Sequence, residues 1–199
     1  MRGLQRGARE LTAAGFSGVI IPDLPPEEAG DAVAAFDAAD IGLAFLIAPT
    51  TPLDRIASIA AASRGFIYVV SRMGVTGADA SLGDAVAGLV GRVRPFTDTP
   101  LAVGFGVATP EHAKTVAAYA DGVIVGSALV ARAAAAADKP QAVREFCEAL
   151  GAAVREARPA SAAPALRSDR AARGRRGEAR PGEDGAGDEM DPDVVAADR

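Results

Sequence analysis

The sequence predicts an α/β fold in which parallel strands are covered by helices. From residue 8 to residue 156, short apolar segments alternate with longer amphipathic or alanine-rich segments, which is typical of parallel strands buried on both faces. Three of the apolar segments run into loops that contain glycine, and α/β enzymes commonly bind ligands at such strand ends. The glycines of these loops are Gly74, Gly77, Gly104, Gly106 and Gly126.

Five strand–helix units are predicted along the chain. The expected strands are residues 18–23, 42–47, 66–70, 101–103 and 122–125. The expected helices are residues 26–39, 52–62, 83–94, 110–119 and a final helical region from 127 to about 156. Pro52 falls near the first turn of its helix, where a missing N–H is tolerated, and Asp54 adds a favourable charge there. A short helix over residues 8–14, closed by Gly15, precedes the first strand and looks like the end of an earlier unit.

Two architectures fit this number of units. A (β/α)₈ barrel takes ~250 residues, and five eighths of that is about 155, close to the length of the patterned region. A complete doubly wound sheet of five strands fits the count equally well.

The glycine loops favour the barrel. Barrels commonly bind a phosphate between the loops after strands 7 and 8 and the N-terminus of a short helix. Here residues 104–106 and 126–127 follow the last two strands, and residues 128–132 supply a helix start. Glycine lets backbone amides approach the oxygens closely, and the helix dipole favours negative charge. The sequence therefore predicts a partial (β/α)₈ TIM barrel over residues 1–156 with a phosphate site, in preference to two ordinary tight turns.

Residues 157–199 differ in composition and predict a disordered, low-complexity tail. They contain no aromatic residue, and their only large aliphatic residues or Met are Leu166, Met190, Val194 and Val195. Such a segment buries too little apolar area to offset the entropy of ordering it. Arginines dominate residues 167–180 and acidic residues dominate 183–193, with no interleaved aromatic side chains, so a solvated tail is favoured over a nucleic-acid arm.

Composition also bounds the class of protein. A formal net charge of −5 does not favour binding to nucleic acid or to an anionic membrane, both of which attract basic surfaces. The single Cys147 excludes an internal disulfide, no Cys/His spacing of the metal-binding kind occurs, and His112 is most simply a surface residue. No segment approaches ~18 consecutive apolar residues, and the N-terminus has no hydrophobic signal core, so we expect a cytoplasmic protein without a membrane span.

Several segments resemble the tryptophan synthase alpha chain family. Residues 71–78, Ser-Arg-Met-Gly-Val-Thr-Gly-Ala, look like the mobile active-site loop of that family. Residues 18–28 resemble its fourth strand and the turn after it. Residues 104–106 and 121–128 match its phosphate loops, although many phosphate-binding barrels share these two. The resemblance covers roughly residues 1–156 and none of the tail.

The resemblance implies a lyase of L-tryptophan biosynthesis. Members of the family cleave indole-3-glycerol phosphate into indole and glyceraldehyde 3-phosphate, and pass indole to a β chain in an α₂β₂ assembly. The pyridoxal phosphate of that assembly belongs to the β chain, so no cofactor and no metal are expected here. The expected partners are indole-3-glycerol phosphate and the β chain.

The resemblance also implies site residues. The phosphate would lie among Gly77, Gly104, Gly106, Gly126 and Ser127. The indole pocket would be lined by Ile20, Tyr68, Phe105 and Ile124, with the Tyr68 hydroxyl near the glycerol part. Plain barrel packing is the alternative for Phe105 and the two isoleucines. Thr76 would steady a catalytic carboxylate when the loop closes, and Arg72 and Gly74 would belong to that lid loop, with Arg72 holding its closed form.

The catalytic pair of the family has no counterpart in the matching segments. Its two carboxylates lie on the second and third strands of the complete barrel, so no catalytic residue is assigned, and losing general acid–base catalysis would cost ~10²–10⁴-fold in rate. Asp23 ends a predicted strand and is a candidate substitute acid, although the family pattern gives it a role in a loop and partner contact. Five strands would leave two unpaired edges and an apolar inner face, so we expect an incomplete gene product or a misplaced start.

Two other functions stay open. One is a different phosphate-sugar barrel enzyme, an isomerase or epimerase, although the single histidine argues against metal-dependent epimerases. The other is a non-catalytic remnant that binds phosphate or docks on a β chain without turning over substrate.

Overall fold

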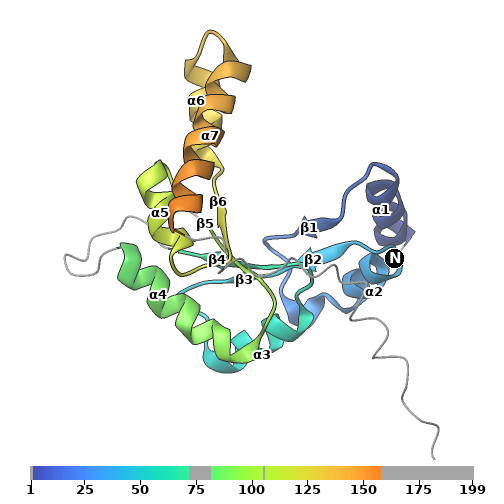
Figure 1. Ribbon diagram of the computed structural model, residues 1–199. Coiled ribbons are helices and arrows are strands. Elements are labelled where there is room, and N and C mark those ends of the chain that lie inside the picture. Colours follow the sequence, from blue (N-terminus) through green and yellow to red (C-terminus); the bar gives the residue numbers. More distant parts are fainter. Residues whose placement is uncertain (1, 72–81, 105, 158–199) are drawn as a thin grey trace, which may run out of the picture. The chain divides into compact units, whose positions relative to one another are not determined.

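The computed structural model describes residues 2–71, 82–104 and 106–157 (Figure 1). All of them lie in the first of two compact units, Met1–Ala165. The predicted tail lies outside the described residues apart from Ala157, so its disorder and the boundary between residues 156 and 157 stay predictions.

The described chain alternates parallel strands and helices, as predicted from the sequence (Figure 1). Its strands are β1 (Gly18–Ile20), β2 (Gly42–Ala44), β3 (Leu46–Ile47), β4 (Ile67–Val70), β5 (Leu101–Gly104) and β6 (Gly122–Ile124). Its α-helices are α1 (Arg2–Ala13), α2 (Gly30–Ala38), α3 (Leu53–Ala62), α4 (Leu82–Val93), α5 (Pro110–Ala117), α6 (Ser127–Ala135) and α7 (Lys139–Ala157). Two 3₁₀ turns, η1 (Pro26–Glu28) and η2 (Arg94–Phe96), complete the described elements.

Several predicted elements differ from the structure in their bounds, most by a few residues, and some are divided. The strand expected over residues 42–47 is two strands, because β2 pairs with β1 whereas β3 pairs with β4, and Phe45 lies between them. The helix expected over residues 26–39 is divided into η1 and α2 at Ala29. The helix expected over residues 8–14 begins at Arg2.

The final helical region also divides, at residues 136–138. Ala136 is extended, with φ −95° and ψ 144°. A new helix then starts at Lys139, with Pro140 in its first turn, where the missing N–H of proline is tolerated. Asp138 caps this start because its carboxylate accepts a hydrogen bond from the Gln141 N–H at 3.0 Å. The local sequence therefore ends α6 and begins α7.

Strand order follows chain order, and every pairing is parallel. One described sheet contains β1 and β2, and the other runs β3-β4-β5-β6. The register aligns Val70 with Gly104 and Gly104 with Ile124, so the carboxyl ends of β4, β5 and β6 meet at one level.

The two faces of the four-stranded sheet have different surroundings. Side chains that point to the helices form the core with apolar residues of α3, α4 and α5; on β4 and β5 they are Ile67, Val69, Leu101 and Val103, all at most 1% exposed. Side chains on the opposite face, Tyr68, Val70, Ala102 and Ile124, are only half-buried. In a closed barrel this second face points inward. One covered face and one half-open face are expected of part of a barrel, whereas helices cover both faces of a doubly wound sheet.

An aspartate fastens the start of β6 to the start of β5. The carboxylate of Asp121 accepts a hydrogen bond from the Leu101 N–H at 2.9 Å and forms an ion pair with Arg94. In return the Asp121 N–H donates to the Leu101 carbonyl at 2.9 Å. The Asp121 side chain is only 14% exposed. Removing it therefore deprives the Leu101 N–H and the Arg94 guanidinium of this acceptor at a mostly buried position.

We expect Asp121→Ala to lower the free energy of unfolding by about 2–3 kcal/mol, because it deletes a charge-assisted pair and a bond to a strand amide. Urea denaturation of the full chain measures this change. Asp98→Ala is the matched control, since Asp98 is exposed, and its effect should stay within about 0.5 kcal/mol. Equal effects of the two substitutions would show that the Asp121 bonds contribute nothing.

Candidate functional site

The candidate site lies where β4, β5 and β6 end. Its centre is Gly104, which pairs with Val70 on one side and Ile124 on the other. Parallel α/β folds place ligands at these carboxyl ends because the loops that follow the strands converge there. Two of the predicted site residues, Tyr68 and Ile124, share the inward face of the sheet with Gly104.

Gly104 allows the close approach of two neighbouring side chains. A Cβ atom at this position would lie 2.5 Å from the Tyr68 hydroxyl, 2.9 Å from Tyr68 Cζ and 2.9 Å from Ile124 Cβ. Real Cβ atoms do not come so close to other heavy atoms, so the phenol ring and the isoleucine occupy the space that any other residue at 104 would need. Partial burial raises the pKa of the Tyr68 phenol above its usual value, so the hydroxyl stays protonated near neutral pH.

The chain turns sharply after β5. Gly106 has a φ of +84°, in the left-handed region that glycine adopts at little cost. The turn leads to Thr109, whose side chain accepts a hydrogen bond from the His112 N–H at 3.2 Å and so caps α5. A glycine is therefore favoured at 106 by backbone conformation, whereas its part in a phosphate site stays a prediction.

The loop after β6 leads directly into a helix. Gly126 is the N-cap of α6 and Ser127 its first residue, and both are exposed. The Gly126 carbonyl accepts from the Leu129 N–H at 3.0 Å. The amides of Ser127 and Ala128, which precede Leu129, have no acceptor within the helix, and they carry the positive end of its dipole. This end of α6 therefore has the electrostatics that an anion requires.

One buried hydroxyl joins β4 to β5 at the site. Ser71, the residue after β4, is 4% exposed, and its Oγ donates to the Gly104 carbonyl at 3.2 Å. Its N–H donates to the same oxygen at 3.0 Å. The sequence placed Ser71 in the lid loop and assigned it no role. In the sequence, Ser71 could have been noticed only because it directly follows a predicted strand, β4, whose last residue pairs with Gly104.

The other predicted site residues are divided between described and undescribed parts of the chain. Ile20 is described and is 39% exposed, but it lies on β1, in the two-stranded sheet, where it pairs with Ala44. The remaining five lie outside the described residues, so their roles stay predictions: Arg72, Gly74, Thr76, Gly77 and Phe105.

Asp23 belongs to a different part of the surface. It lines a hollow of about 350 Å³ together with Pro22, Phe45, Thr51 and Arg55. None of the predicted phosphate or indole residues lines this hollow. Its rim includes a bidentate ion pair in which Arg55 donates to both carboxylate oxygens of Glu27, each at 3.0 Å. Leu46, which pairs with Tyr68, also lines this hollow, so the role of Asp23 as a substitute acid stays a prediction.

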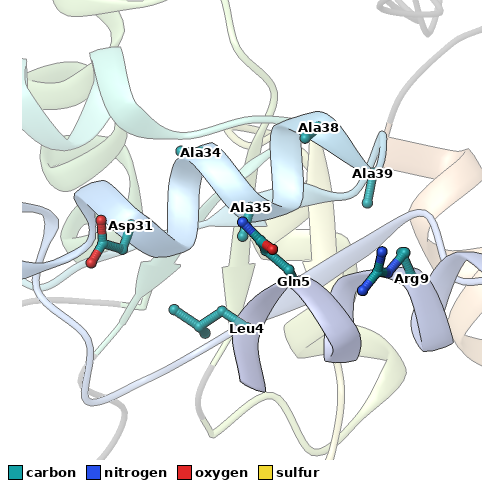
Figure 2. Close-up of a pocket in the computed structure, with 8 residues that line it drawn as sticks. All are labelled: Leu4, Gln5, Arg9, Asp31, Ala34, Ala35, Ala38 and Ala39. Carbon is teal, nitrogen blue, oxygen red and sulfur yellow. The ribbon is translucent and has the colours of Figure 1, made fainter. Parts of the chain in front are cut away.

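A second hollow, of about 310 Å³, lies between α1 and α2 (Figure 2). Alanines of α2 form much of one wall, and Leu4 and Gln5 of α1 form part of the other. Arg9 and Asp31 lie toward opposite ends of this groove (Figure 2). It is lined by helices alone and contains none of the strand-end residues.

Two kinds of feature are absent from the described ranges. No three His, Cys, Asp or Glu side chains gather there in a way that could hold a metal ion. No helix there is long and apolar enough to cross a membrane.

Comparison with known proteins identifies the family. The model of the family "Tryptophan synthase alpha chain" matches residues 2–158. The tryptophan synthase alpha chain of Mycobacteroides abscessus is 50% identical over 155 residues, which cover 78% of this chain and 58% of that protein.

Solved structures agree. A tryptophan synthase structure from Mycobacterium tuberculosis superimposes with a TM-score of 0.68 at 44% identity, covering 76% of this chain and 57% of that one. A structure of the α₂β₂ tryptophan synthase complex from Pyrococcus furiosus gives 0.67 at 32% identity, covering 76% and 62%. The chain thus spans less than two thirds of the length of these relatives. The match to the family model across nearly the whole described region shows that the chain belongs to the tryptophan synthase alpha chain family.

Proposed function

We propose that the ends of β4, β5 and β6 bind indole-3-glycerol phosphate, the substrate of the lyase reaction of this family. The observation that carries the proposal is the close packing of Tyr68 and Ile124 around Gly104, beside the left-handed turn at Gly106. Together they combine an apolar wall, a protonated hydroxyl and backbone suited to a phosphate within a few residues of one another.

Each part of the substrate has a proposed counterpart. The phosphate would accept hydrogen bonds from amides near Gly106 and from Gly126 and Ser127 at the start of α6, where the helix dipole favours negative charge. The indole would lie against Tyr68 and Ile124, and the Tyr68 hydroxyl would reach the glycerol part. Gly77, Thr76, Arg72, Gly74, Phe105 and Ile20 complete the proposed site by family resemblance.

Aldol cleavage requires proton transfers at the substrate. The described residues at the ends of β4, β5 and β6 are Tyr68, Val70, Ser71, Gly104 and Ile124, and no carboxylate is among them. Without a positioned acid and base, the acceleration should fall by ~10²–10⁴-fold. We therefore propose that the described part binds the substrate but turns it over poorly on its own.

We also propose a tryptophan synthase β chain as partner, in an α₂β₂ type of assembly, acting in the cytoplasm. Support comes from the relatives, whose solved forms include the α₂β₂ complex of Pyrococcus furiosus. On this chain the loops after β1 and β3 are held in place by side-chain hydrogen bonds, so they present a fixed surface to a partner. Arg55 ties α3 to Glu27, and the Arg92 guanidinium donates to the carbonyls of Pro49 and Thr51, each at 2.8 Å.

Isothermal titration of the full chain with indole-3-glycerol phosphate tests the proposal, together with an indole-release assay with and without added β chain. We expect binding of the substrate, and release of indole at least about 10²-fold slower than by a full-length relative, because no carboxylate is among the described residues at these strand ends. Binding without turnover is the result expected of the non-catalytic alternative as well. Absence of any binding to substrate, phosphate or β chain would refute the proposed function.

We expect Gly104→Ala to weaken binding of indole-3-glycerol phosphate more than about tenfold and to lower stability by about 1–3 kcal/mol, because the new methyl group displaces Tyr68 or Ile124. Adding Tyr68→Ala should restore part of the lost stability but not the binding.

Gly88→Ala is the control for this prediction. Gly88 lies within α4 with open space around it, so alanine there should raise stability by about 0.5–1 kcal/mol and leave binding unchanged. If Gly104→Ala bound the substrate as well as Gly88→Ala, the close packing at residue 104 would have no part in the site.

A further inference from the structure

The groove between α1 and α2 differs from the strand-end site in both position and lining (Figure 2). Eight residues line it: Leu4, Gln5 and Arg9 of α1, and Asp31, Ala34, Ala35, Ala38 and Ala39 on or directly after α2. None of these eight belongs to the candidate site or to the loops proposed to meet a β chain. A role for the groove is therefore independent of the proposed function.

The α2 wall of the groove is apolar and made of small side chains. Ala34 and Ala38 are four residues apart, so they lie on the same face of the helix, and both are exposed. A wall of methyl groups lets another helix approach closely, because the distance between packed helix axes depends on the side chains at the contact. Burying these methyl groups against a partner is favourable, since it removes apolar surface from water.

The two ends of the groove carry charges of opposite sign, on opposite walls. Arg9 of α1 lies at the end near Ala39, whereas Asp31, in the first turn of α2, lies at the other end (Figure 2). About 12 Å of helix separates Asp31 from Ala39, at 1.5 Å per residue. Both charged side chains are exposed, and within the described ranges neither forms an ion pair, whereas Arg6 of α1 pairs with Glu10 at 2.7 Å.

This diagonal arrangement is self-complementary about a two-fold axis. In an isologous contact the same patch of both copies is used, so that if one residue meets a second residue of the other copy, the reverse contact also forms. An axis through the centre of the groove and perpendicular to it brings Arg9 of each copy over Asp31 of the other. The two copies of α2 then run antiparallel, which places opposite ends of their dipoles side by side.

We propose that the α1–α2 groove is an interface between two copies of this chain, in which the alanine walls pack together about a two-fold axis and Arg9 of each copy pairs with Asp31 of the other. The contact is small, because eight residues line each side against ~20–30 in an interface of standard size. The dimer is therefore expected to be weak, with a dissociation constant of about 10–100 μM.

Sedimentation velocity of the full chain, over concentrations on both sides of that constant, tests the proposal. Arg9→Glu and Asp31→Arg each turn both ion pairs into like-charge contacts, so each variant alone should dimerise at least about tenfold more weakly. Both positions are exposed, so the fold should persist, which far-UV circular dichroism checks. Arg144→Glu is the matched control, since Arg144 is exposed on α7 and does not line the groove, and it should dimerise as the unchanged chain does.

Mixing the two variants gives the decisive measurement. In a mixed dimer the new glutamate of one chain faces the new arginine of the other, and the remaining Arg9 faces the remaining Asp31. Both contacts are attractive again, so an equimolar mixture should associate about as tightly as the unchanged chain. The double variant Arg9→Glu/Asp31→Arg should do the same on its own. Charges that acted only within one chain would give no recovery on mixing.

Every outcome bears on the choice of occupant. A chain that remains monomeric at ~1 mM, well above the expected dissociation constant, would overturn the proposal and leave the groove to a different partner. Self-association that neither charge reversal weakens would place the contact on another surface, such as the half-open face of the sheet, and would overturn it too. So would weaker association of both variants without recovery in the mixture. Recovery in the mixture, with Arg144→Glu unaffected, would support the two-fold contact.

Discussion

The in-register pairing of β4, β5 and β6 at Val70, Gly104 and Ile124 is the constraint on which the site depends. Parallel pairing brings three strand ends to one level, so the loops that follow them lie close together without any additional contact being needed. The middle strand must then end in a residue without a Cβ atom, because Tyr68 and Ile124 fill that space. The same pairing brings Ser71 to the Gly104 carbonyl, which links the end of one strand to the turn after the next.

Most of the fold could be predicted from the sequence, because the parallel strands are continuous apolar segments and the helices between them are amphipathic. The burial of Ile67, Val69, Leu101 and Val103 confirms that pattern. The bounds were less accurate where pairing partners change. Nothing in the apolar run from Gly42 to Ile47 indicates that β2 and β3 pair with different neighbours, since this depends on contacts with β1 and β4.

The candidate site was predictable only where backbone conformation demands a residue type. Gly104 and Gly106 were predicted from a short glycine pattern, and the structure gives a physical reason for glycine at each, a close approach at 104 and a positive φ at 106. The bond between Ser71 and Gly104 was not predicted, because it depends on burial and joins residues 33 positions apart. A serine after a strand looks the same in sequence whether it is buried or exposed.

The two faces of the sheet separate folding from function. The helix-facing side chains form a continuous core with α3, α4 and α5, so the described units gain their stability from burial that does not involve the site. The opposite face holds Tyr68, Val70, Ala102 and Ile124, half-buried and mostly apolar. Binding surfaces of this kind need only shape and backbone amides, whereas proton transfer needs carboxylates held at defined positions. Under the proposed function, substrate recognition would therefore use the ends of β4, β5 and β6, whereas proton transfer would need carboxylates that are not among the described residues at those ends.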